Sequence, residues 1–234
     1  MNKKLSLISA IFVFALSALP LKAMANDEAS ALALAEYFRA ARGVIAKNQA
    51  LINDASKGDK GLSGDAVVSA ANAAYKGSTD VALIKSLQDS VKAVMGEAQD
   101  LINEKGVGFK GFLPAVFGGQ VAKSFSASQA GKAEIKLTAP KDYVRNRANK
   151  PDKWEEDAIE KSFKSAGWEK GKTVSESTKK GGKDAFRLIL PEYYGEACLS
   201  CHGEPKGELD ITGGKKEGGK LGELGGAISV TLYK

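Results

Sequence analysis

The sequence predicts an α+β protein with an antiparallel sheet. Amphipathic helical segments come first, over about residues 29–126, and short strand-like segments follow over about residues 133–233, interleaved with one further helix. Helices and strands that occur in separate runs are typical of α+β folds, because a regular alternation of the two would instead indicate a parallel sheet. The hydrophobic content of 43% is sufficient for a packed core.

Two long helices are predicted in the N-terminal half, over residues 29–53 and 81–104. Each segment repeats apolar side chains every three or four positions, the pattern of a helix with one buried face. The stripes include Leu32, Ala35, Phe38 and Ile45 in the first segment and Ile84, Leu87, Val91 and Val94 in the second. We expect the stripes to pack against each other beside the sheet, because a chain of this size has nowhere else to bury them. If both instead pair with a second chain, the protein is a helical homodimer, which the sequence also permits.

Shorter elements account for most of the remaining chain. They are a helix over 65–75, a helix over 114–126, a strand over 133–138, a helix over 151–165 and strands over 185–190 and 227–233. Pro114 suits the first position of its helix, where the missing N–H has no helical partner. Segments 54–64 and 203–223 are rich in glycine and polar residues and are predicted as loops.

Residues 1–25 have the features of a secretory signal. Two lysines precede an apolar run from Leu5 to Leu19, and Ala23-Met24-Ala25 forms a cleavage site, so we expect the mature chain to begin at Asn26. The alternative is an uncleaved membrane anchor. It is disfavoured because the run of about 15 residues is shorter than the ~20 that cross a bilayer. Export of this kind indicates a bacterial periplasm.

Cys198, Cys201 and His202 form a C-x-x-C-H motif and are the only cysteines and the only histidine in the chain. This spacing is the attachment signature of c-type haem, whose two vinyl groups bond the thiols while the adjacent imidazole binds the iron. We expect one covalent haem c with His202 as the proximal ligand. A thioredoxin-like pair would need a βαβ context, which is not predicted here. Structural zinc would need four ligands, and a plain disulfide leaves His202 without a role.

Length and charge agree with one haem-binding domain. Cleavage leaves 234 − 25 = 209 residues, which we expect to form a single domain over 26–234 with a helical part (26–105) and a haem part (106–234). The net charge of +6 falls to 6 − 3 = +3 when Lys3, Lys4 and Lys22 leave with the signal. Two haem propionates would bring it close to neutral, so nucleic acid is not an expected partner.

The segments laid out above resemble the periplasmic single-haem c-type domains with a PAS-like fold, a haem-PAS sensor-like family of otherwise unknown function. The matching segments are 108–117, 135–138, 145–149, 151–155, 198–203 and 226–230, which run in family order. The resemblance implies a PAS-like antiparallel sheet packed by helices, with haem held against it near the C-terminus. It implies redox sensing or electron transfer rather than catalysis. Some relatives supply a distal thiolate from the N-terminal helix, but this chain has no third cysteine for that role.

The sixth iron ligand has few candidates. Met95 is the only methionine left once Met1 and Met24 are removed with the signal. It is either a distal ligand or an ordinary core residue packed beside Val91 and Ala98, as methionine often is on an amphipathic helix. The other options are an open or water-bound site, or an unusual lysine, tyrosine or terminal amine ligand.

Four further residues are candidates for the haem environment. Arg145 is expected to pair with a propionate in a charge-assisted bond, the alternative being a solvated surface position. Trp154 is expected to pack on the porphyrin or, alternatively, in the protein core. Tyr193 and Tyr194 precede the motif and are expected to wall the haem.

These features predict a periplasmic monohaem c-type cytochrome that exchanges electrons with a redox partner protein or senses redox state. The alternative is a sensor of a gas or another small ligand, which would signal through a separate membrane-bound partner. A haem enzyme such as a peroxidase is disfavoured, because no second histidine exists to act as a distal acid–base group.

Overall fold

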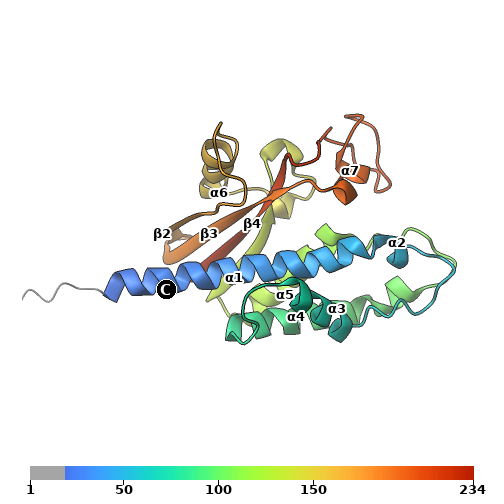
Figure 1. Cartoon of the computed structure of the whole chain (residues 1–234), viewed down its shortest axis with the longest axis horizontal. Helices are drawn as coiled ribbons and strands as arrows, with labels where there is room; N and C mark the ends of the chain where they lie inside the picture. Colours follow the sequence, from blue (N-terminus) through green and yellow to red (C-terminus); the bar gives the residue numbers. More distant parts are fainter. Residues whose placement is uncertain (1–18) are drawn as a thin grey trace, which may run out of the picture.

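A layer of helices packs beside a four-stranded antiparallel sheet (Figure 1), so the predicted α+β fold is confirmed. The structure is a computed structural model and describes residues 19–234, with side chains from residue 25 onward. Residues 1–18 of the predicted export signal lie outside the described residues. No helix in the described part combines the length and apolarity needed to cross a membrane.

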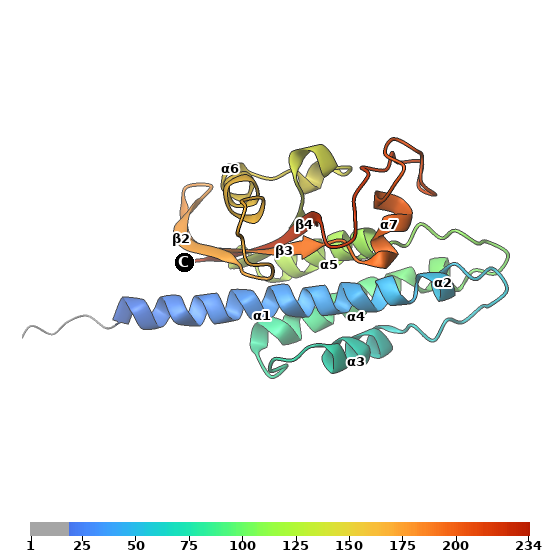
Figure 2. The same ribbon diagram turned by 45° about the horizontal axis from the view of Figure 1, so that its top comes forward.

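The helical layer consists of five helices that precede the first strand (Figure 2). They are α1 (Leu19–Lys47), α2 (Gln49–Ile52), α3 (Gly64–Ala74), α4 (Ala82–Asn103) and α5 (Pro114–Ser128). The two long helices α1 and α4 contact each other, as the stripes predicted, and α3 and α5 pack against both. One core cluster joins their apolar faces to the sheet and includes Phe38, Ile45, Leu87 and Met95.

The first predicted helix is divided near its end. At Asn48 the helical chain breaks between α1 and α2, and the Asn48 side chain donates a 2.8 Å hydrogen bond to the carbonyl of Val44. Asparagine competes for backbone groups in this way, which is why it interrupts helices.

The sheet has the strand order β1-β4-β3-β2, and each neighbouring pair is antiparallel. The strands are β1 (Ala133–Thr138), β2 (Val174–Lys180), β3 (Lys183–Tyr193) and β4 (Leu224–Tyr233). Val230 of β4 lies opposite Ile135 on one side and Leu188 on the other, so apolar residues meet across β1, β4 and β3.

Strand β2 was not predicted from the sequence. It is an edge strand of largely polar residues without a clean alternation, and it owes its position to a hairpin through Gly181 and Gly182, both with positive φ. The predicted strand 185–190 also extends through Pro191. The pairing of β3 with β2 stops at Ile189. On that side of β3, Pro191 therefore has no neighbouring strand that would need the N–H that proline lacks.

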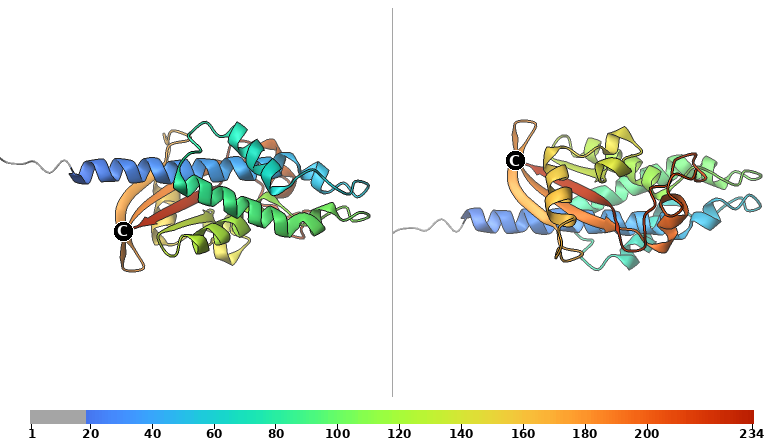
Figure 3. Two further views of the ribbon diagram at one scale, coloured as in Figure 1. Left: turned by 90° about the horizontal axis from the view of Figure 1, so that it is seen from below. Right: turned by 90° about the horizontal axis from the view of Figure 1, so that it is seen from above.

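Helices cover both faces of the sheet. The helices α1 and α5 lie on one face, and the helical segment that contains α6 lies on the other (Figure 3). Strand β3 is therefore buried continuously from Ala185 to Pro191. The second face carries a smaller core around Ile159, Phe163 and Ile189.

The predicted helix 151–165 is two segments, the α-helix α6 (Lys153–Asp157) and a π-helical continuation η3 (Ala158–Phe163). A capping box between Asp152 and Glu155 fixes its start. Two short 3₁₀ turns, η1 (Lys141–Tyr143) and η2 (Arg147–Asn149), precede it. The last helix, α7 (Glu196–His202), follows β3 and carries the C-x-x-C-H motif.

Candidate functional site

The motif residues lie on the short helix α7, at the end of the sheet away from the C-terminus (Figure 1). Positions three and four apart share a helix face, so Cys198 lies on the same side as Cys201 and His202. Both thiols are free and partly buried.

A cavity of about 250 Å³ separates α7 from the C-terminal half of α1. Cys198 and His202 line it from one side, and Arg39, Arg42, Gly43 and Ala46 of α1 line it from the other. The remaining lining residues are Pro114, Glu192, Tyr193, Tyr194, Gly225 and Gly226. The motif, both predicted tyrosines and the long N-terminal helix therefore meet at one place.

The imidazole of His202 contacts Glu217 through one ring nitrogen and Tyr194 through one ring face. Nδ1 lies 2.8 Å from Oε2 of Glu217. The ring stacks on Tyr194, with centroids 5.4 Å apart and an angle of 22° between the planes. Nε2 forms no hydrogen bond with the described residues, so it is the nitrogen available to a metal.

The ring of Tyr194 is held by the glycine-rich loop 203–223 and the start of β4. A Cβ on Gly219 or on Gly225 would lie 2.4 Å from a carbon of this ring, so only glycine leaves room on either side. The backbone of Tyr194 also bonds the loop, donating to Glu223 and accepting from Gly222. Burial, followed by the nearby Glu217 carboxylate, raises the pKa of Tyr194, so its phenol stays protonated at neutral pH.

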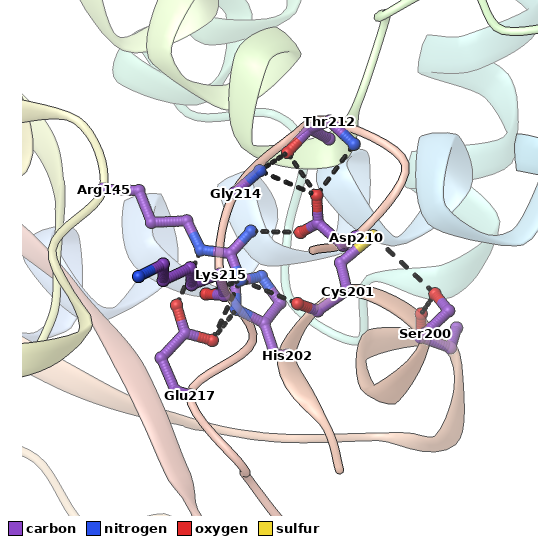
Figure 4. A network of polar contacts seen from close by, with 10 residues as sticks. Arg145, Ser200, Cys201, His202, Asp210, Thr212, Gly214, Lys215 and Glu217 are labelled. Carbon is purple, nitrogen blue, oxygen red and sulfur yellow. Dashed lines mark hydrogen bonds and ion pairs between the residues drawn. The ribbon is translucent and has the colours of Figure 1, made fainter. Parts of the chain in front are cut away.

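Arg145 lies beside the motif and contacts the loop at several points (Figure 4). Nε donates to Glu217 at 2.6 Å, and Nη2 donates to the carbonyls of Cys201 at 2.7 Å and Lys215 at 3.0 Å. Nη1 pairs with Asp210, whose other oxygen accepts from the backbone and hydroxyl of Thr212. The guanidinium is thus largely engaged by protein groups.

A second charged cluster lines the cavity from α1. Arg39 donates from Nε to Glu192 at 3.0 Å, and Arg42 pairs with the other oxygen of the same carboxylate. Burial would raise the pKa of Glu192, but the two guanidinium groups overcome this and hold it below its ordinary value. Two cations face one anion, so this wall of the cavity carries an excess positive charge.

The residues present fit a c-type haem. Two free thiols stand beside an imidazole with one free nitrogen, and aromatic rings and an excess positive charge complete the surroundings. Porphyrin offers an apolar macrocycle and two carboxylates that suit such a lining. The cavity is smaller than the roughly 300–1,000 Å³ of sites that enclose a small molecule, so a haem held there would remain partly exposed.

Two of the predicted site residues lie elsewhere. Met95 is fully buried in the helical core, and Trp154 packs on the far face of the sheet, with the Arg187 guanidinium 4.3 Å from its ring centre. Neither lines the cavity beside His202. The roles predicted for both remain predictions.

Sequence reasoning missed Glu217 and the α1 arginines. Arg42 carried a signal, because it is a charged residue within the apolar stripe of the first helix. Glu217 carried none, since it is one of several acidic residues in a loop rich in lysine and glycine. Only the fold of that loop brings it to His202.

A family model described as Tll0287-like matches residues 21–232. Neither the curated proteins nor the solved structures contain a significant match to this chain.

Proposed function

The chain belongs to the Tll0287-like family, and we propose that it is a periplasmic c-type cytochrome with one covalent haem, acting in electron transfer or redox sensing. The carrying observation is that His202, with Nδ1 already bonded to Glu217, lines a cavity beside Cys198. When bound, the haem supplies one-electron redox chemistry at its iron.

The protein's side chains attach the haem, bind its iron and surround it. Cys198 and Cys201 hold the group by thioether bonds, and His202 offers Nε2 as the proximal ligand. Tyr193 and Tyr194 wall the cavity with aromatic carbon, which excludes water from one side. In this proposal the partners of the two propionates are Arg39 and Arg42, because both line the cavity and outnumber their one carboxylate partner, Glu192. Arg145 does not line the cavity, and it bonds Glu217 and Asp210.

Export to the periplasm is compatible with the packing of α1. Among the side chains that the structure describes, from residue 25 onward, the first buried one in this helix is Ala31. Cleavage before Asn26 would therefore leave this described packing intact. The contacts of Asp27 with Lys234 and of Glu28 with Ser175 would also remain. The mature protein would then exchange electrons with a redox partner protein or report to a membrane-bound signalling partner.

A specific observation favours the alternative, a sensor of a gas or another small ligand. Apart from Cys198 and His202, the residues that line the cavity include no histidine, methionine or cysteine. The strong ligands that usually close a sixth position are therefore missing from this lining. Tyr194 is a poor substitute, because its raised pKa keeps the phenol protonated.

Intact-mass measurement tests the proposal. After expression with a haem-attachment system and acid–acetone extraction, the protein should retain the mass of one haem on a chain that begins at Asn26. Cys198→Ala and Cys201→Ala should each weaken attachment, whereas Ser200→Ala, an exposed change between them, should not. Complete loss of haem from the wild-type chain on extraction would disprove covalent attachment.

A further inference from the structure

We propose that Glu217 is a positioning residue for His202, which fixes the ring with Nδ1 protonated and makes its Nε2 a more electron-donating ligand. The inference rests on the proposed haem function and adds the control of its reduction potential. Glu217 is separated from the motif by a loop of polar residues and glycines, and nothing in the sequence pattern linked it to His202.

The geometry fixes both oxygens of the Glu217 carboxylate. Oε1 accepts from Nε of Arg145 at 2.6 Å, and Oε2 accepts from Nη2 of Arg145 at 3.1 Å and faces Nδ1 of His202 at 2.8 Å. Only 7% of the Glu217 side chain is exposed, so water competes little for these bonds. Figure 4 shows the carboxylate in contact with both the guanidinium and the imidazole.

The charge state of Glu217 determines the tautomer of His202. Both oxygens of Glu217 pair with the guanidinium of Arg145, which is always charged, and a two-point pairing of this kind is the geometry of a carboxylate. A carboxylate only accepts hydrogen bonds. Nδ1 of His202 must then carry the proton, which in the neutral ring leaves the lone pair on Nε2.

A carboxylate that holds the Nδ1 proton increases the basicity of the imidazole toward a metal. Greater donation from Nε2 stabilises the more highly charged ferric state and lowers the reduction potential. The positive charge of Arg145 weakens this effect of the Glu217 carboxylate, but Arg145 also pairs with Asp210. One cation faces two carboxylates in this network, so a net negative charge remains beside the ring.

The loop has anchors that do not depend on the charge of Glu217. Arg145 bonds the carbonyls of Cys201 and Lys215, and Asp210 bonds the backbone of Thr212 and Gly214. The backbone of Gly219 also donates to the carbonyl of His202 at 2.8 Å. Glu217→Gln keeps the shape and one acceptor oxygen, so it should remove the charge and leave the loop folded.

The first experiment needs neither a haem nor a variant. His202 is the only histidine, so the nitrogen NMR spectrum of the unloaded protein, labelled with ¹⁵N-histidine, reports on this ring alone. Under conditions in which the ring is neutral, it should show a protonated Nδ1 and an unprotonated Nε2. A ring protonated at Nε2 instead would overturn the inference whatever the cofactor.

The second experiment measures the reduction potential of the haem-loaded full chain. Glu217→Gln should shift the one-electron equilibrium toward ferrous iron by at least tenfold, about 59 mV, and should lower the iron–histidine stretching frequency in the Raman spectrum. The matched control is Glu208→Gln, which removes one charge from the same loop, where Glu208 pairs with Lys216 and is half-exposed. Its potential should stay at the wild-type value.

The outcomes separate the two proposals. A wild-type chain that carries no covalent haem would overturn the proposed function, and the tautomer would still test the positioning by Glu217. A loaded Glu217→Gln protein with the same potential as Glu208→Gln would overturn the inference and leave the haem function intact. If Glu217→Gln fails to fold, the tautomer of His202 in the wild-type protein still tests whether Glu217 positions the ring.

Discussion

The ring of Tyr194 lies almost parallel to the imidazole of His202, with 5.4 Å between the ring centres. Tyr194 is buried, and its hydroxyl has no hydrogen-bond partner among the described residues. The contribution of this side chain is therefore its ring, which supports one face of the histidine.

Removal of that ring should destabilise the protein. Tyr194→Ala should lower the free energy of unfolding by about 3 kcal/mol, since it leaves a cavity where a large aromatic ring was buried. Tyr194→Phe keeps the ring and removes a hydroxyl without a partner, so it should change stability by less than about 1 kcal/mol. Urea unfolding of the unloaded proteins measures both. Equal losses in the two variants would show that the hydroxyl, and not the ring, matters.

The glycines beside Tyr194 should resist substitution. Gly219→Ala and Gly225→Ala each place a Cβ 2.4 Å from a ring carbon, and overpacking of this kind typically costs about 1–3 kcal/mol. The control is Gly96→Ala, an exposed helical position where a Cβ meets nothing within 4 Å. That change should stabilise the protein by about 0.5–1 kcal/mol. Neutral Gly219 and Gly225 variants in thermal unfolding would show that the ring can move aside.

The sequence was sufficient to predict the α+β class and the long helices, because apolar periodicity reports directly on burial. It did not predict β2, whose polar residues have no such periodicity and whose place depends on a hairpin with β3. The division of the first helix at Asn48 was missed because one side-chain hydrogen bond, rather than a change in periodicity, produces it.

At the candidate site, the residues that line the cavity and were predicted from the sequence are close to the motif in the chain. Tyr193 and Tyr194 immediately precede α7, and the structure brings both to the cavity. Arg39 and Glu192 are brought together across the fold by a contact between α1 and β3, and a single sequence does not report contacts over such separations. Arg145, which is distant from the motif in sequence, pairs with carboxylates of the protein. The pairing with a haem propionate expected for it stays a prediction.

The pair of arginines around Glu192 should make stability depend on pH. The folded-state pKa of Glu192 is lowered, so its contribution is present above the unfolded value of about 4.3 and is lost as the pH falls through the folded value. Glu192→Gln should therefore be less stable than wild type at pH 7, and the difference should shrink toward pH 3. Urea unfolding at both pH values measures this. Glu176→Gln, on an exposed position of β2, should show no such dependence, and a constant difference for Glu192→Gln would contradict the prediction.

The last prediction concerns the sixth position of the iron. Met95 is fully buried among the apolar residues of the helical core, so we expect it to act as a packing residue and the sixth position to be open or bound by water. Met95→Leu nearly conserves volume and should cost less than about 1.5 kcal/mol, whereas Met95→Ala should cost about 2–5 kcal/mol. In both wild type and Met95→Leu, the ferrous protein should bind carbon monoxide with the same optical change. If Met95 is instead the distal ligand, the ferric wild type should show the near-infrared band of His/Met haem, and Met95→Leu should abolish it. A low-spin spectrum that neither the substitution nor carbon monoxide alters would exclude both states and require a lysine, tyrosine or terminal amine as the ligand.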